Sequence, residues 1–198
     1  MPKVVDHEAR RLEISGIVAG LIAKGGLEAA TIREIARSSG YSKGVVEHYF
    51  ENKQALISAA LAWVNQCYEE RVDRATRGLA GLPALRKMIE ATLPLTGQIR
   101  DEWKVRLVFW SMAAIDPGLR RQQAKRLDGA IERYEALLRS ATERGEISTI
   151  GDYESVARHV LNFTTGICTA ALHQQQRYTR DFLLREIDYV IVRVTAEN

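Results

Sequence analysis

The 198-residue sequence has only two cysteines and no long apolar run, whereas many cysteines mark disulfide-rich proteins and long apolar runs mark membrane-spanning ones. Its two cysteines, Cys67 and Cys168, lie far apart in apolar helical contexts, so we expect buried free thiols in a reducing cytoplasm. No apolar run is long enough to cross a bilayer, and no signal peptide is visible. We therefore expect a cytoplasmic protein with no membrane partner.

Proline is also scarce, with four in the whole chain. Pro83 and Pro117 stand where helical patterns begin, and Pro94 stands where one ends or kinks. No stretch alternates apolar and polar residues well enough to indicate a strand. We predict an all-α fold of about nine helices. Two short helices are expected within 31–50, and the others at 6–24, 53–77, 83–96, 101–114, 117–144, 152–176 and 180–196.

The patterns of catalytic and cofactor sites are missing too. The four histidines do not have metal-ligand spacing; they are His7, His48, His159 and His173. Gly25 and Gly26 form a helix stop rather than a phosphate-binding loop, and no Ser or Cys lies in a nucleophile motif. We expect no enzyme, no metal and no cofactor. A helical-bundle enzyme whose site is assembled only in space stays open as an alternative.

Positive charge is too weak to indicate nucleic acid by itself. The net charge is +3, and residues 1–53 hold eight Lys or Arg against seven Asp or Glu. An attractive field for DNA must therefore come from the placement of Arg33, Arg37, Lys43 and Lys53. We expect modest non-specific affinity that depends on salt.

One stretch does indicate a specific chemistry, TIREIARSSGYSKGVVEHYFENK at residues 31–53. Thr31 and Glu34 form a capping-box pattern, in which the hydroxyl and the carboxylate bind first-turn amides. Gly40 can take the left-handed conformation that ends the helix, and Ser42 is a good N-cap for a second helix. Two short helices joined by a tight turn predict a DNA-reading helix-turn-helix.

The exposed side of the second helix, 43–50, is expected to meet DNA. Val46 and Phe50 should pack inward, which leaves the N-terminal residues facing out. Lys43 suits guanine, and Val45 suits a thymine methyl. Glu47 departs from the pattern, because phosphate repels it unless it accepts from cytosine or pairs with Arg or Lys. The predicted DNA-binding residues are Thr31, Arg33, Ser42, Lys43, Gly44, Val45, Glu47, His48, Tyr49 and Lys53.

Lys53 follows directly behind this motif. Asn52 is the expected N-cap of the next helix, which places Lys53 in a first turn where the helix dipole disfavours a cation. A DNA phosphate docked at that N-terminus would reverse the penalty. By itself Lys53 reads as a solvated surface lysine; placed after HYFEN it is predicted to hold a phosphate together with Thr31, Arg33 and Tyr49.

The segment TIREIARSSGYSKGVVEHYFENKQAL resembles the DNA-binding region of the TetR family of bacterial regulators. The resemblance extends upstream through 11–24, and G-x-S-x-G-x-x-x-H-Y-F is similar to the BetI-like branch. A second, weaker resemblance lies downstream, at residues 103–104 and 109–110. The resemblance implies a homodimeric repressor that a small-molecule effector releases from a palindromic double-stranded operator. It also implies a DNA-binding domain at 1–52 and an effector-binding and dimerisation domain at 53–198.

The last two predicted helices carry an apolar stripe and a row of small residues. Periodicity alone leaves open whether these face a second copy or the chain's own core. The resemblance implies that they pair into a four-helix bundle between two copies. The predicted interface residues are Thr165, Gly166, Thr169, Ala170, Leu183, Ile187, Val190, Ile191 and Val194.

The middle helices hold many large side chains that read either as plain core or as an effector cavity. The resemblance implies the cavity. Its predicted lining is Trp63, Cys67, Met88, Trp103, Leu107, Trp110, Tyr134 and Phe163. A choline-like cation would suit an aromatic cage through cation–π attraction, although the nearby acids Glu69, Glu90, Asp101 and Glu102 read more readily as solvated helix charges. The remaining alternative is a helical protein-interaction module that does not bind DNA.

Overall fold

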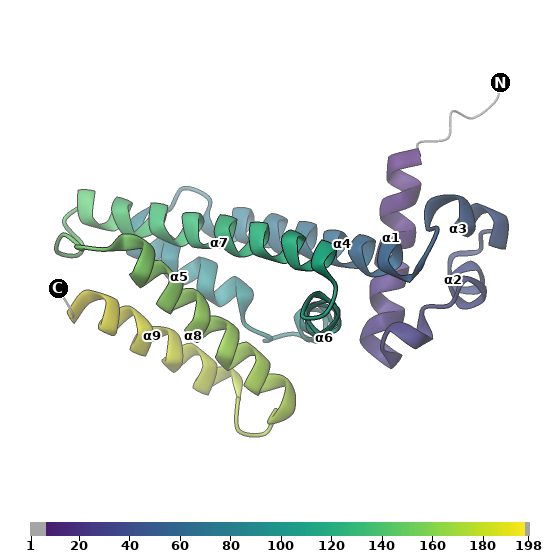
Figure 1. Cartoon of the computed structure of the whole chain (residues 1–198). Helices are drawn as coiled ribbons and strands as arrows, with labels where there is room; N and C mark the ends of the chain where they lie inside the picture. Colours follow the sequence, from purple (N-terminus) through teal and green to yellow (C-terminus); the bar gives the residue numbers. More distant parts are fainter. Residues whose placement is uncertain (1–6, 197–198) are drawn as a thin grey trace. The chain divides into compact units, whose positions relative to one another are not determined.

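The computed structural model describes residues 7–196, and all regular secondary structure in that range is helical (Figure 1). It contains the following elements: α1 His7–Gly25, η1 Leu27–Ala29, α2 Ile32–Ser39, α3 Lys43–Tyr49, α4 Lys53–Thr76, α5 Gly81–Thr92, α6 Gly97–Ala113, α7 Pro117–Glu143, α8 Tyr153–His173 and α9 Arg180–Ala196. The prediction of an all-α fold with about nine helices is confirmed. The short 3-10 turn η1 was not predicted.

The ends of α5 differ from the predicted 83–96. The helix stops at Thr92 because Leu93, which precedes Pro94, takes an extended conformation with ψ 141°. At the other end it begins at Gly81, two residues before Pro83. The following helix, α6, begins earlier than the predicted residue 101, since the Thr96 hydroxyl accepts the Ile99 amide over 3.3 Å and caps it.

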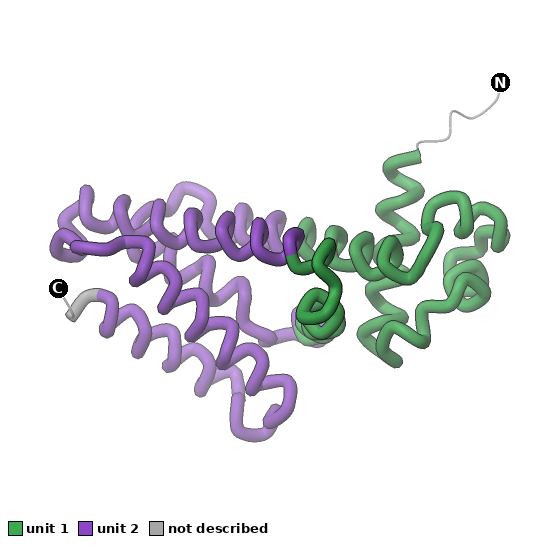
Figure 2. The backbone as a smooth tube through the Cα atoms, in the orientation of Figure 1, with its two compact units in different colours: residues 1–67, 100–120 green, residues 68–99, 121–198 purple. Residues whose placement is uncertain are grey.

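The chain divides into two compact units, which Figure 2 shows in different colours. Unit 1 consists of residues 1–67 and 100–120, and unit 2 consists of residues 68–99 and 121–198. Unit 1 therefore holds α1 to α3, the first part of α4, most of α6 and the start of α7. Unit 2 holds the remainder of α4 and α7 together with α5, α8 and α9.

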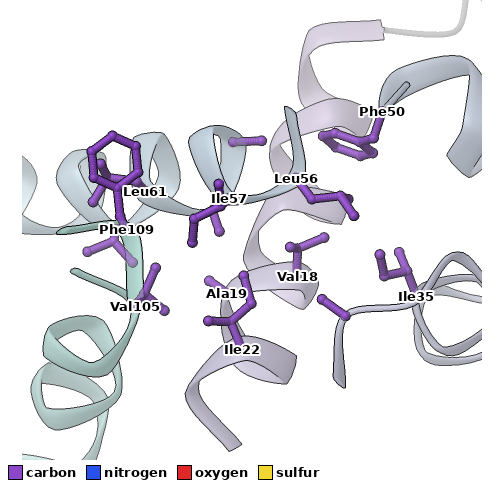
Figure 3. Packing of buried hydrophobic residues seen from close by; sticks show 14 of the residues in the cluster. Val18, Ala19, Ile22, Ile35, Phe50, Leu56, Ile57, Leu61, Val105 and Phe109 are labelled. Atoms are coloured by element: carbon purple, nitrogen blue, oxygen red, sulfur yellow. The ribbon is translucent and has the colours of Figure 1, made fainter. Parts of the chain in front are cut away.

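A single apolar cluster fixes the helices of unit 1 (Figure 3). Ile14, Val18 and Ile22 recur every four residues along α1, so they form one buried stripe. Figure 3 shows Phe109 of α6 beside Leu61 of α4 within the same cluster. Each such side chain contributes about 1.5–3 kcal/mol by leaving water. The remaining labelled members are Ala19, Ile35, Phe50, Leu56, Ile57 and Val105.

Trp63 connects α4 to α1 within this unit. A Cβ placed on Gly16 of α1 would lie 2.9 Å from Nε1 and Cε2 of the Trp63 indole. The ring therefore lies directly on the α1 backbone, where only glycine leaves it room. This contact gives Trp63 a packing role in the unit that carries the helix-turn-helix.

In unit 2, α5 contacts both α8 and α9, and α8 and α9 lie side by side (Figure 1). Arg86 of α5 and Asp188 of α9 form a solvent-exposed ion pair. The N-terminus of α5 is capped by a residue that is distant in sequence, because Oε2 of Glu146 accepts a hydrogen bond from the Leu82 amide over 2.6 Å. Gly81 passes beside that carboxylate with φ 57°.

Candidate nucleic-acid interface

Three side-chain caps and one left-handed glycine build the helix-turn-helix. Thr31, Ser42 and Asn52 each accept a hydrogen bond from the amide three residues later, over 3.2, 3.3 and 2.8 Å. Gly40 ends α2 with φ 72°. These four predicted features are confirmed: the three caps set the starts of α2, α3 and α4, and Gly40 sets the end of α2.

The carboxylate of Glu34 is used differently from the capping-box prediction. Its two oxygens bind the guanidinium of Arg37, with Oε2 3.0 Å from Nε and Oε1 2.5 Å from Nη2. This pairing is the main reason that the pKa of Glu34 is lowered. A bidentate, charged pair is stronger than a bond to a neutral amide, which explains the exchange of partner. Arg37, expected to contribute to the DNA field, therefore has its charge balanced on its own helix.

The face of α3 that was predicted to meet DNA is largely open to solvent. Lys43, Gly44, Glu47 and His48 are exposed, while Val45 is half-buried. Val46 behind them is fully buried, so the helix is held by its inner side. The exposed N-terminal residues are therefore presented on a rigid support. Of the other predicted contacts, Thr31, Arg33 and Ser42 are exposed as well.

Tyr49 has a partner that sequence reasoning missed. Its hydroxyl lies 2.8 Å from Nδ1 of His7, the first residue of α1, and its ring centroid lies 5.4 Å from that of His48. If the His7 proton is on Nδ1, the ring donates to the hydroxyl and leaves the hydroxyl proton free for a phosphate. His7 and Tyr49 are 42 residues apart, so no local pattern links them.

Lys53 also has a partner that was not predicted. Its Nζ lies 2.7 Å from Oε1 and 2.8 Å from Oε2 of Glu28 in η1. Both side chains remain well exposed, at 61% for Lys53 and 83% for Glu28. In this structure, a carboxylate therefore lies where a DNA phosphate was predicted.

The residues predicted to line an effector cavity are divided between the two units. Trp63, Cys67, Trp103, Leu107 and Trp110 belong to unit 1, and Met88, Tyr134 and Phe163 belong to unit 2. In unit 1, the rings of Trp103 and Trp110 meet edge to face, with centroids 5.8 Å apart.

Glu102 contradicts the expectation of a solvated helix charge, because it is only 2% exposed. Its Oε2 lies 3.9 Å from Nη1 of Arg106, and the Arg106 guanidinium lies over the Trp103 ring, 5.4 Å from the centroid. A buried carboxylate requires such a countercharge. Glu102 lies three residues from the buried Ile99 and from the buried Val105, so helical spacing places it on the apolar side of α6 although its charge favours solvent.

In unit 2, Tyr134 lies in the interior. Its hydroxyl has hydrogen bonds with Thr164 and Thr92, and burial, reinforced by Tyr68, raises the pKa of its phenol. The Cys168 thiol beside it donates to the Thr92 carbonyl over 3.7 Å. Tyr134 is thus part of a buried polar cluster. Met88 is buried as well, whereas Phe163 is half-buried.

The predicted dimer residues fall into two groups. On α9, Leu183, Ile187, Val190 and Val194 are at most 7% exposed in the single chain, so their side chains face the chain's own interior. The apolar periodicity of α9 therefore belongs to a stripe that packs against the chain's own core. Ile191, Thr165, Thr169 and Ala170 are half-buried, and Gly166 is exposed.

Two residues that sequence reasoning missed, Tyr189 and Val192, are 52% and 60% exposed. They are three residues apart on α9 and form a second apolar strip on its outer side. The Tyr189 ring also lies 6.5 Å from that of Phe163 on α8, measured between centroids.

Comparison with known proteins matches both parts of the chain. Residues 19–60 match the bacterial regulatory proteins of the tetR family, and residues 83–195 match the C-terminal part of BetI-type transcriptional repressors. The chain belongs to the TetR family. The branch predicted from the HYF motif is confirmed by the second match.

Several similar proteins are described as transcriptional regulators. The regulator PksA of Bacillus subtilis is 24% identical over 199 residues, covering 100% of this chain and 96% of its own. BetI of Ectopseudomonas mendocina is 30% identical over 126 residues, covering 62% of this chain and 64% of its own length. A transcriptional regulator from Saccharomonospora viridis, solved with choline, has a TM-score of 0.83 at 22% identity. That match covers 93% of this chain and 96% of the other.

TetR regulators bind DNA operators, act as dimers and bind small-molecule effectors. This member is accordingly a DNA-binding transcriptional regulator and not an enzyme, as the sequence predicted. Across residues 7–196, no helix combines the length and apolar character needed to span a membrane.

Proposed function

We propose that this TetR-family protein is a cytoplasmic repressor, whose two copies read a palindromic operator and leave it when an effector binds. In this proposal residues 1–52 read DNA, and residues 53–198 hold the effector and the dimer contact. The observation that carries it is the exposed N-terminal face of α3, which is held by the buried Val46. Two such helices related by symmetry read half-sites about one helical turn apart.

The side chains of this face have distinct proposed roles. Lys43 donates to guanine, and the half-buried Val45 meets a thymine methyl. Ser42 and Gly44 allow close approach, because space is open around Gly44. Glu47 accepts from a cytosine amine or turns to a basic neighbour, and His48 lies at the edge of the groove.

Phosphate contacts are proposed for Thr31, Arg33, Tyr49 and Lys53. These residues lie at the start of α2, the end of α3 and the start of α4. Contacts of this kind fix register but carry no sequence information directly. Substitution of any of these four residues is therefore expected to lower affinity for all duplexes equally.

The test is selection of bound duplexes from a random library, followed by measurement of affinity for the selected sequence. A palindromic sequence is expected. Lys43→Ala should change the base preference at one position of each half-site, with a cost of about 1–3 kcal/mol. Recovery of no common sequence, or of an asymmetric one, would contradict a symmetric reader.

For the effector we propose a quaternary ammonium cation of the choline type. Support comes from the edge-to-face pair of Trp103 and Trp110, and from the buried carboxylate of Glu102, which precedes Trp103 on α6. The Arg106 guanidinium lies over the Trp103 ring, so in this proposal the ammonium group of the effector takes the place of that guanidinium on the ring. The structural relative solved with choline has the same fold.

A neutral isostere of choline provides the control for this assignment. Choline should change tryptophan fluorescence and lower affinity for the selected duplex, whereas 3,3-dimethylbutan-1-ol should not. The change should be lost in Trp103→Leu. Equal responses to the two compounds would show that the positive charge is not recognised.

A further inference from the structure

We propose that Glu28 sets the affinity of the protein for DNA by holding Lys53 in place of a phosphate. This inference rests on the proposed DNA-binding role of Lys53. The carboxylate of Glu28 places both oxygens against Nζ, at 2.7 and 2.8 Å. Two oxygens at these distances present the amine with the charge and bonding that a DNA phosphate offers.

The position of Lys53 explains why an anion is held there. Lys53 is the first residue of α4, where the unpaired amides give the helix end a partial positive charge. A lysine at this place is disfavoured unless an anion joins it. Glu28, which comes from η1 and is 25 residues away in sequence, supplies that anion in the free protein.

Stability does not account for the pair. With 61% of Lys53 and 83% of Glu28 exposed, water and salt screen their attraction, and such surface pairs contribute little to folding. The effect of Glu28 is instead expected in the DNA complex. A phosphate that binds Lys53 must displace the carboxylate and then lies close to its negative charge.

The consequence concerns all duplexes equally. Residues 1–53 have nearly balanced charge, so one carboxylate at a phosphate-binding lysine removes a large share of the attraction. Glu28 is not on the reading helix α3, and its partner Lys53 is the first residue of α4, where a phosphate contact and not a base contact is proposed. It therefore lowers affinity without changing base preference, and so limits retention on non-operator DNA.

The experiment compares the intact protein with Glu28→Gln by fluorescence anisotropy, using the selected duplex and a scrambled duplex at several salt concentrations. The variant should bind both duplexes roughly three- to tenfold more tightly at low salt, with a log–log salt slope steeper by about one. Glu28→Ala should give the same gain, since both variants remove the carboxylate and the alanine variant introduces no side-chain amide. Thermal unfolding midpoints should match, which shows that the variants fold.

Glu51→Gln is the matched control, because it removes the same charge from an exposed residue just before α4. Its gain should be smaller. In a Lys53→Gln background, Glu28→Gln should give no more than the gain of Glu51→Gln. The inference is overturned if Glu28→Gln and Glu51→Gln give equal gains, or if Glu28→Gln gives its full gain in the Lys53→Gln background. Glu28 would then act only through the net charge of the protein.

The two proposals fail separately. If the intact protein binds the duplex and Glu28→Gln binds no better, the Glu28 inference alone is wrong. If neither protein binds any duplex at low salt, the proposed function is wrong and the inference falls with it.

Discussion

The side-chain amide of Gln54 donates to Oδ2 of Asp116 over 2.8 Å, and so joins the first turn of α4 to the turn before α7. The other carboxylate oxygen of Asp116 accepts the Leu119 amide, also over 2.8 Å. One aspartate therefore caps α7 and attaches that cap to the helix that follows the DNA-reading motif. Both contacts lie inside unit 1.

Separating these two contacts gives the first prediction. Gln54→Leu removes only the link and should cost about 0.5–1.5 kcal/mol of unfolding free energy. Asp116→Ala removes the link and the cap, and the lost cap should add about 1 kcal/mol. Urea unfolding of the single and double variants measures the coupling. If the two losses were additive in the double variant, Gln54 and Asp116 would not interact.

A second prediction concerns Gly81, whose φ of 57° is combined with close contact to the Glu146 carboxylate. Gly81→Ala should destabilise the protein by about 2 kcal/mol or more, since the left-handed conformation alone costs an alanine about 1–2 kcal/mol. Gly78→Ala is the control, because Gly78 has φ 74° but open space around it. Thermal unfolding should show the larger loss at Gly81, and equal losses would exclude a role for the carboxylate.

The same carboxylate predicts a dependence of stability on pH. The pKa of Glu146 is lowered, first by its hydrogen bond with Arg144 and then by the Leu82 amide. The folded state therefore binds this proton less tightly than the unfolded chain does. Its stabilisation is present above the ordinary value of 4.5 and is lost as the pH falls below that value through the lowered pKa.

Glu146→Gln should accordingly lose less stability than the unmodified protein when the pH is lowered through this range. Urea midpoints measured across the range test the difference. Glu132→Gln changes an exposed glutamate on α7 and serves as the control. A decline as steep in Glu146→Gln as in the unmodified protein would mean that other carboxylates cause the acid sensitivity.

Features fixed by neighbouring residues could be predicted from the sequence. Helix caps and left-handed glycines act over a few residues, so the local sequence is enough to predict them, as it does for Thr31, Ser42, Asn52 and Gly40. Contacts between distant segments were missed, because nothing local specifies which elements meet. Lys53 with Glu28, Tyr49 with His7 and Leu82 with Glu146 are separated by 25, 42 and 64 residues.

The same limit explains the α9 prediction. Helical periodicity identifies the apolar stripe that includes Ile187, but it cannot say whether the stripe meets the chain's own core or a second copy. Burial in the single chain decides this for Ile187, which is fully buried. Glu102 shows a different limit, since residue type alone predicts an exposed carboxylate, whereas its spacing from Ile99 and Val105 places it on the buried side of α6.

The exposed side of α9 gives the last prediction. Val192 is 60% exposed, whereas Ile187 is fully buried on the same helix. Val192→Glu places a charge on the outer strip and should weaken dimerisation at least tenfold, or about 1.4 kcal/mol, with little change in monomer folding. Ile187→Ala should instead cost about 2–5 kcal/mol of folding stability by leaving a cavity. Sedimentation equilibrium and urea unfolding separate the two effects. A Val192→Glu protein that dimerises as tightly as the unmodified one would place the dimer contact elsewhere than on the Tyr189 and Val192 strip.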